Sequence, residues 1–173
     1  QTVVNNIWVP DGMKDMPADR TLYRRLLRDS LDEIFAVRYP AELVVDAVEC
    51  KLFGIGLESF TVGSHEFYMG YLAHARADGN DSLMLTLDMG HFHPTETIAD
   101  KISSLLLFNS HLLIHVSRAV KWDSDHVVIS DENLQDVMRE IKRAAAFDRV
   151  YLATDFFDGS INRIAAWVIG VRA

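Results

Sequence analysis

Four apolar runs in the sequence each end in a carboxylate or an imidazole. The runs VVDAVE, LMLTLD, LLIH and VYLATD finish at four acceptor residues: Glu49, Asp88, His115 and Asp155. If the runs are neighbouring strands of a parallel sheet, these side chains converge, because the carboxyl ends of parallel strands lie at one edge. Three carboxylates and one imidazole suit Mn²⁺ or Mg²⁺, with Zn²⁺ or Co²⁺ as alternatives. The sequence therefore predicts a divalent-metal site at this edge.

A second group of acceptors lies just beyond these strand ends. His91 follows Asp88 by three residues, past a turn at Gly90. Asp123 and Asp125 are two residues apart, so an extended segment points both side chains the same way. We predict that His91, Asp123 and Asp125 hold a second divalent ion near the first. Without cations, the five carboxylates of the two groups would repel one another strongly in a partly dehydrated site.

Each of these residues also has an ordinary structural explanation. A lone histidine after an apolar run is more often a hydrogen-bonded core residue, and an aspartate at a strand end often caps a helix or forms a turn. Asp123 and Asp125 could simply be solvated loop charges. Independent capping roles, however, would not predict one acceptor at the end of each of four strands. Lys51, two residues after Glu49 on the same strand face, would enter the same site or form a salt bridge to Glu49, and both can hold.

The segments that must position these residues alternate between strand and helix. Apolar runs predict strands at 6–9, 43–53, 83–87, 112–116 and 150–154. Apolar periodicity predicts helices at 19–38, 64–77 and 95–108, one that begins at the cap Ser130, and one that Ser160 opens. Thr95 is the expected N-cap of the third helix. The expected apolar positions are Leu22, Leu26, Ile34 and Phe35 in the first helix, Phe67, Tyr71 and Leu72 in the second, Ile98, Ile102, Leu105 and Leu106 in the third, and Leu134, Val137, Met138 and Ile141 in the fourth.

Five strand-then-helix units with continuous apolar strands indicate an α/β fold in which helices cover a parallel sheet. A doubly wound sheet and a (β/α)8 barrel both fit this order. A complete barrel needs eight units and typically about 250 residues. We therefore expect residues 1–173 to form a single (β/α) domain that is an incomplete barrel.

Bulk composition narrows the partners and the compartment. A net charge of −8 argues against nucleic acid or an anionic membrane surface as the main partner. The single cysteine, Cys50, excludes an intrachain disulfide and favours the cytoplasm. No apolar run approaches the roughly 20 residues of a membrane helix. The sequence starts at Gln1 rather than methionine and shows no secretory signal, so we expect a piece of a longer chain.

Several long motifs resemble L-rhamnose isomerase. They are WVPDGMKDMPADR, DAVECKLFGIG, GSHEFYMGY, LDMGHFHPTE, LLIHVSR, KWDSDHVV and LATDFFDGSINRIAAWVIG, and they are spread over nearly the whole chain. The resemblance implies a barrel of the xylose-isomerase type, a homo-tetramer, and interconversion of L-rhamnose and L-rhamnulose with divalent metals, usually Mn²⁺. It also implies that this chain is a central-to-C-terminal fragment. The family's structural-metal ligands fall on Glu49, Asp88, His115 and Asp155, and its catalytic-metal ligands on His91, Asp123 and Asp125.

The resemblance implies a metal-assisted hydride shift between C1 and C2 of the sugar. We assign the first metal to orientation of the sugar and the second to the chemistry, with His91 and Asp123 as catalytic residues. Lys51 is expected to polarise a sugar oxygen or to brace Glu49. Two other functions compete: a catalytically incompetent folded fragment, and a metal-dependent hydrolase on a related barrel, which the acidic charge disfavours. We expect the isolated chain to be weakly active at best.

Overall fold

The computed structural model describes residues 2–9, 19–50, 61–93, 95–120, 123–156 and 162–173, with only the backbone of 123–125. The chain divides into two compact units, Gln1–Thr86 and Leu87–Ala173. The boundary between them falls within one strand of the sheet. Across the described residues, no helix is long and apolar enough to cross a membrane.

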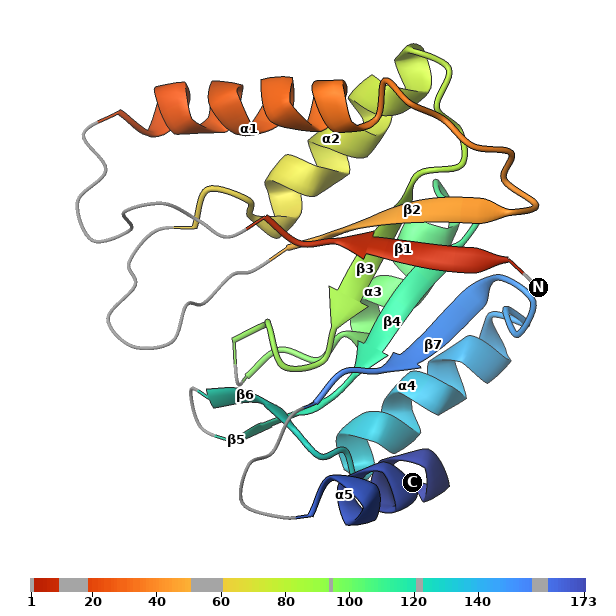
Figure 1. The fold of residues 1–173 in the computed structure, drawn as a ribbon. Coiled ribbons are helices and arrows are strands. Elements are labelled where there is room, and N and C mark those ends of the chain that lie inside the picture. The colour runs from red at the N-terminus through yellow and green to blue at the C-terminus, as the bar shows by residue number, and fades with distance from the viewer. Residues whose placement is uncertain (1, 10–18, 51–60, 94, 121–122, 157–161) are drawn as a thin grey trace. The chain divides into compact units, whose positions relative to one another are not determined.

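The parallel sheet carries its strands in chain order. The strands are β1 (Val3–Ile7), β2 (Val44–Glu49), β3 (Met84–Asp88), β4 (Leu112–Val116) and β7 (Val150–Thr154), and the sheet order is β1-β2-β3-β4-β7. In Figure 1 the arrowheads of β4 and β7 point the same way, as do those of β1 and β2. A doubly wound sheet reverses its strand order at a switch point, and this sheet does not. The structure thus confirms parallel (β/α) units of an incomplete barrel.

The first unit contains α1 (Arg20–Ile34) and α2 (His65–Ala77). The two helices meet where Phe35, just past α1, lies with its ring centroid 6.1 Å from that of Tyr71 on α2. The Tyr71 hydroxyl donates a hydrogen bond to Asp32 Oδ1 at 2.9 Å. At its two ends α2 behaves as predicted, because Ser64 caps its start and Asp78 its end, where Gly79 adopts a φ of +79°.

The buried face of α1 differs from the prediction. Its core residues are Leu27, Leu31 and Phe35, spaced four apart, whereas Leu22, Leu26 and Ile34 are exposed. The helix carries two apolar stripes, and the buried one includes Phe35, whose ring lies near Tyr71 of α2. Apolar periodicity alone gives equal weight to both stripes.

The second unit contains α3 (Ala99–Leu106), α4 (Glu132–Arg143) and α5 (Arg163–Arg172), and α3 packs against α4. The predicted inner face of α3 is confirmed, but the helix begins at Ala99 rather than at Thr95. Thr95 is not an N-cap, because its backbone N–H donates to His93 Nδ1 at 3.2 Å and its hydroxyl lies 2.7 Å from the same atom. These local bonds hold a turn before the helix.

Two further caps differ from the prediction. Asp131, not Ser130, caps α4, since its carboxylate accepts a hydrogen bond from Leu134 N at 3.0 Å. On the predicted inner face of α4, Leu134, Val137 and Ile141 are buried but Met138 is exposed. The cap of α5 is Asn162, and Ser160 lies outside the described residues. A two-stranded antiparallel ribbon, β5 (Arg118–Val120) and β6 (Asp123–His126), follows β4 and was not predicted.

Candidate metal centre

The carboxylate of Asp88 is the most constrained polar group of the site. It ends β3, whose residues are all buried, and its own exposed fraction is 0%. The Oδ1 atom accepts two hydrogen bonds, from Gly90 N at 2.6 Å and from Ser117 Oγ at 2.9 Å. Among the described residues, no group donates a hydrogen bond to the buried Oδ2 atom. One oxygen of the carboxylate is therefore held and the other is left for a different partner.

Two imidazoles and a second carboxylate surround this oxygen. His115 Nδ1 lies 3.6 Å from Asp88 Oδ2 and 3.0 Å from Asp155 Oδ2. His91 Nε2 lies 3.8 Å from Asp88 Oδ2. Both histidines are buried, while the Asp155 side chain is 43% exposed. The second unit thus brings together four of the predicted acceptors.

Backbone pairing at the strand ends explains why these side chains meet. The register of β4 and β7 pairs His115 with Ala153, two residues before Asp155. Side chains two positions apart in a strand share a face, so His115 and Asp155 point to the same side. Met89 N donates to His115 O at 3.1 Å, which aligns the end of β3 with the end of β4.

A divalent cation fits the arrangement better than hydrogen bonding alone. The 3.0 Å contact between His115 Nδ1 and Asp155 Oδ2 can be an ion pair or a hydrogen bond and needs no metal to explain it. Among the described residues, however, Asp88 Oδ2 is buried and receives no hydrogen bond, because the imidazole nitrogens at 3.6 and 3.8 Å are too distant to donate to it. An unpaired buried carboxylate oxygen is costly. One ligand atom each from Asp88, His115 and Asp155 lies within 4.8 Å of the others, a spacing that one ion can bridge.

Glu49, the other predicted ligand of this group, lies in the first unit at the end of β2. It is buried, and its Oε2 atom accepts a hydrogen bond from Asn6 Nδ2 at 2.6 Å. Asn6 Oδ1 in turn accepts from Thr86 Oγ1 at 2.6 Å. Register pairs Glu49 with Thr86, so three neighbouring strands contribute to one chain of hydrogen bonds. The neutral amide of Asn6 therefore helps to orient the Glu49 carboxylate.

The second predicted metal site stays a prediction. His91 is placed beside Asp88, as described above. Asp123 and Asp125 lie in β6, but their side chains are outside the described part of the chain. Lys51 also lies outside it.

Three hydrogen-bonding residues of the site were not predicted: Asn6, Thr86 and Ser117. Thr86 did carry a signal, since it is a polar residue inside an apolar strand and on the same face as Asp88. Ser117 follows the apolar strand that contains His115, two residues later, which is a similar signal. Asn6 had none, because its partners are 43 and 80 residues away in the sequence.

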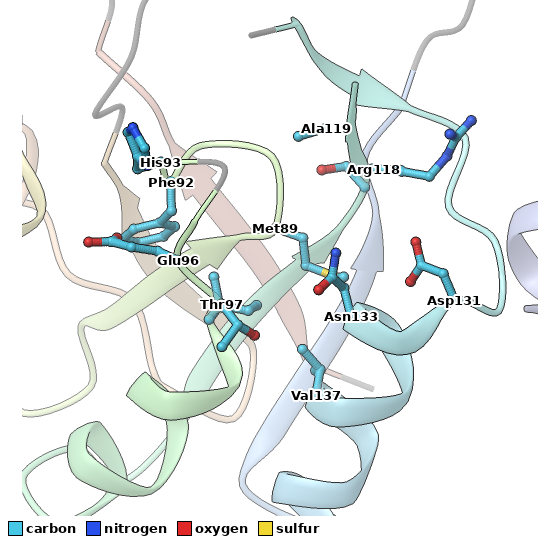
Figure 2. Close-up of a pocket in the computed structure, with 12 residues that line it drawn as sticks. Met89, Phe92, His93, Glu96, Thr97, Arg118, Ala119, Asp131, Asn133 and Val137 are labelled. Atoms are coloured by element: carbon cyan, nitrogen blue, oxygen red, sulfur yellow. The ribbon is translucent and has the colours of Figure 1, made fainter. Parts of the chain in front are cut away.

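A small cavity of about 100 Å³ lies beside Ser117 in the second unit. Figure 2 shows its walls: Met89, Phe92, His93, Glu96 and Thr97 come from the segment after β3, Arg118 and Ala119 from β5, and Asp131, Asn133 and Val137 from the start of α4. Pockets that bury small organic ligands are larger, about 300–1,000 Å³. The cavity has room for a few water molecules and is not a sugar site by itself.

Parallel strands in chain order, joined by helices and bearing carboxylates and an imidazole at their carboxyl ends, define a protein of the (β/α)-barrel class with a candidate divalent-metal site. Within that class, the chain belongs to the L-rhamnose isomerase family, because the family model described as L-rhamnose isomerase (RhaA) matches residues 1–173.

Two relatives show the extent of the similarity. The L-rhamnose isomerase of Rhodopirellula baltica (strain DSM 10527 / NCIMB 13988 / SH1) is 60% identical over 169 residues, which cover 98% of this chain and 38% of the relative. The L-rhamnose isomerase of Yersinia pestis (strain Pestoides F) is 57% identical over 169 residues, or 98% of this chain and 39% of the relative. The chain therefore spans less than two fifths of the length of these relatives.

Proposed function

We propose that this chain contributes to an enzyme that interconverts L-rhamnose and L-rhamnulose with divalent cations. Two facts support the proposal. The first is membership of the L-rhamnose isomerase family. The second is the buried Asp88 Oδ2 atom, which lies near His115 and His91 and receives no hydrogen bond within the described part of the chain. The second carries more weight for the chemistry, because a family name by itself does not place a metal.

Four residues would hold the first cation in this proposal: Glu49, Asp88, His115 and Asp155. Glu49 is included because its register partner, Thr86, precedes Asp88 by two residues in β3. Positions two apart in a strand share a face, so the carboxylates of Glu49 and Asp88 end neighbouring strands on the same side. The oxygen-rich ligand set favours Mn²⁺, with Mg²⁺, Zn²⁺ and Co²⁺ as alternatives.

Three residues would hold a second cation: His91, Asp123 and Asp125. Isomerisation moves one hydrogen between C1 and C2 of the sugar and one proton between the two oxygens on those carbons. Bound cations would supply Lewis-acid stabilisation of the negative charge that develops on these oxygens. His91 and Asp123 are our candidate catalytic residues at this second cation. The Lys51 ammonium would donate a hydrogen bond to the sugar oxygen that becomes negative.

An alternative proposal is that this chain is a folded but catalytically incompetent part of such an enzyme. It is favoured by the coverage, since 38% of the relative's length aligns with this chain. A metal-dependent hydrolase on a related barrel is a weaker alternative, because a net charge of −8 opposes binding of a polyanionic substrate such as nucleic acid.

We also propose that the protein works in the cytoplasm as a homo-oligomer, with a tetramer as the specific expectation, and without nucleic-acid or membrane partners. Cys50 is the single cysteine of the sequence, so no intrachain disulfide can form, which supports a reducing compartment. Exposed apolar side chains on α5, among them Trp167 and Val171, support further protein contacts. Light scattering over a range of concentrations would test the oligomer.

The direct test of the activity is conversion of L-rhamnose to L-rhamnulose, measured after chelation and again after Mn²⁺ is restored. The Rhodopirellula baltica relative, assayed at its full length, is the positive control. Mn²⁺-dependent turnover by this chain would support the isomerase proposal. Turnover by the relative only would favour the incompetent alternative, and turnover by this chain that persists after chelation would contradict the metal requirement.

A further inference from the structure

We propose that Ser117 is a positioning residue, which holds the Asp88 carboxylate so that Oδ2 faces the cation. The inference rests on the proposed metal site and deepens it. It starts from the 2.9 Å hydrogen bond that Ser117 Oγ donates to Asp88 Oδ1. Both residues have an exposed fraction of 0%, so bulk water does not compete for this bond.

The Asp88 carboxylate needs such a partner because its terminal torsion is intrinsically soft. Rotation about the bond to a planar carboxylate has broad minima, so neighbouring donors must set its plane. Gly90 N and Ser117 Oγ approach the same oxygen, from the turn after β3 and from the end of β4 respectively. Together they fix the plane and leave Oδ2 directed toward His115 and His91.

The chemical nature of the donor also matters. A serine hydroxyl is neutral, so it orients the carboxylate without cancelling the charge that attracts a divalent ion. A lysine or arginine at this position would form a charged pair with Asp88 and compete with the metal. Partners of this kind, which hold a metal ligand rather than the metal, typically change metal affinity about 10- to 100-fold when removed.

Threonine and valine form a matched pair of variants at Ser117, which is among the residues that line the space of about 100 Å³. Both add the same methyl group, so both make the same demand on the packing. Ser117→Thr keeps the hydroxyl and Ser117→Val replaces it with a methyl of similar size. Any difference between the two variants therefore reports the hydroxyl and not the change in packing. Ser117→Ala serves as a second deletion if the valine variant folds poorly.

The test is Mn²⁺ binding, measured by calorimetry and by the electron paramagnetic resonance spectrum of the bound ion. We expect Ser117→Thr to bind as the parent chain does, and Ser117→Val and Ser117→Ala to bind about 10- to 100-fold more weakly with an altered spectrum. Ser82→Ala is the control, because it removes a hydroxyl that bonds only to Asn80 in the described structure. Circular dichroism checks that each variant is folded.

Each outcome separates the positioning role from the metal site itself. Equal affinity and spectrum for the threonine and valine variants would overturn the role of Ser117 while leaving the metal site intact. Failure of the unmodified chain to bind Mn²⁺ would overturn the proposed site and, with it, this inference. Loss of Mn²⁺ affinity in Ser82→Ala as large as in Ser117→Val would also overturn it, because the effect would then be general.

Discussion

The Nδ1 atom of His115 lies 3.0 Å from the Oδ2 atom of Asp155, although the residues belong to different strands. Their meeting follows from the parallel register of β4 and β7, in which His115 pairs with Ala153. No long side chain has to reach across the sheet, because both residues stand at strand ends on one face. The parallel register of β2 and β3 likewise places Thr86 beside Glu49. In both cases, strand pairing positions the polar side chains.

Asn6 is predicted to stabilise the fold through its position between Thr86 and Glu49. Asn6→Ala removes the acceptor of the Thr86 hydroxyl and a donor to the buried Glu49 carboxylate. A buried polar group that loses its hydrogen-bond partner costs about 1–3 kcal/mol, so the free energy of unfolding should fall by that amount. Urea unfolding measures it.

The Thr86→Val variant provides the matched comparison for Asn6. It removes only the hydroxyl at the far end of the same chain of hydrogen bonds. The double variant Asn6→Ala/Thr86→Val should lose less unfolding free energy than the sum of the losses in the two single variants. The reason is that it has no Thr86 hydroxyl left without an acceptor. Strict additivity would show that the three residues do not act as a connected group.

Tyr71 is predicted to make stability fall at alkaline pH. Burial and the hydrogen bond to Asp32 raise the pKa of Tyr71 above its ordinary value near 10. Because the folded state holds the phenolic proton more tightly, the unfolded state releases it first, and stability is lost as the pH rises above about 10. Urea unfolding between pH 8 and 11.5 measures this slope.

The Tyr71→Phe variant isolates that effect from the other tyrosines. It should unfold with a shallower loss of stability above pH 10 than the parent chain, while the two slopes agree near pH 8. Identical slopes across the whole range would mean that Tyr71 titrates alike in both states.

The start of α4 gives a prediction about two adjacent residues. Asp131→Ala should lower the free energy of unfolding by about 0.5–2 kcal/mol, because it removes the acceptor of Leu134 N. Ser130→Ala is the control and should change it by less than about 0.5 kcal/mol, as for most surface substitutions. A larger loss for Ser130→Ala would restore Ser130 as the cap that the sequence had suggested.

Sequence reasoning succeeded where one physical signal had no competitor. The strands β4 and β7 have the predicted bounds because their apolar runs are continuous and end at polar residues. It failed where neighbours compete: Ser130 and Asp131 are both good caps, and α1 has a second apolar stripe through Leu22.

The candidate site divides along a similar line. The acceptor residues Asp88, His115 and Asp155 could be predicted, because the end of an apolar run can be read directly from the sequence. Their hydrogen-bond donors could not. Ser117 is 29 residues from Asp88, and its role depends on how two strand ends align in space.

The central claim, that Asp88 helps to hold a divalent cation, is tested most directly by Mn²⁺-dependent thermal unfolding of the parent chain and Asp88→Asn. The asparagine oxygen can still accept from Gly90 and Ser117, so the variant should fold. A ligand at 100 times its Kd stabilises a protein by about 2.7 kcal/mol, so Mn²⁺ should raise the Tm of the parent chain by several degrees.

The exposed Asp136, which pairs with Arg139, supplies the control variant Asp136→Asn. The account predicts that Mn²⁺ raises the Tm of the parent chain and of Asp136→Asn alike, and leaves that of Asp88→Asn unchanged. An equal rise for Asp88→Asn, or no rise for the parent chain, would contradict it.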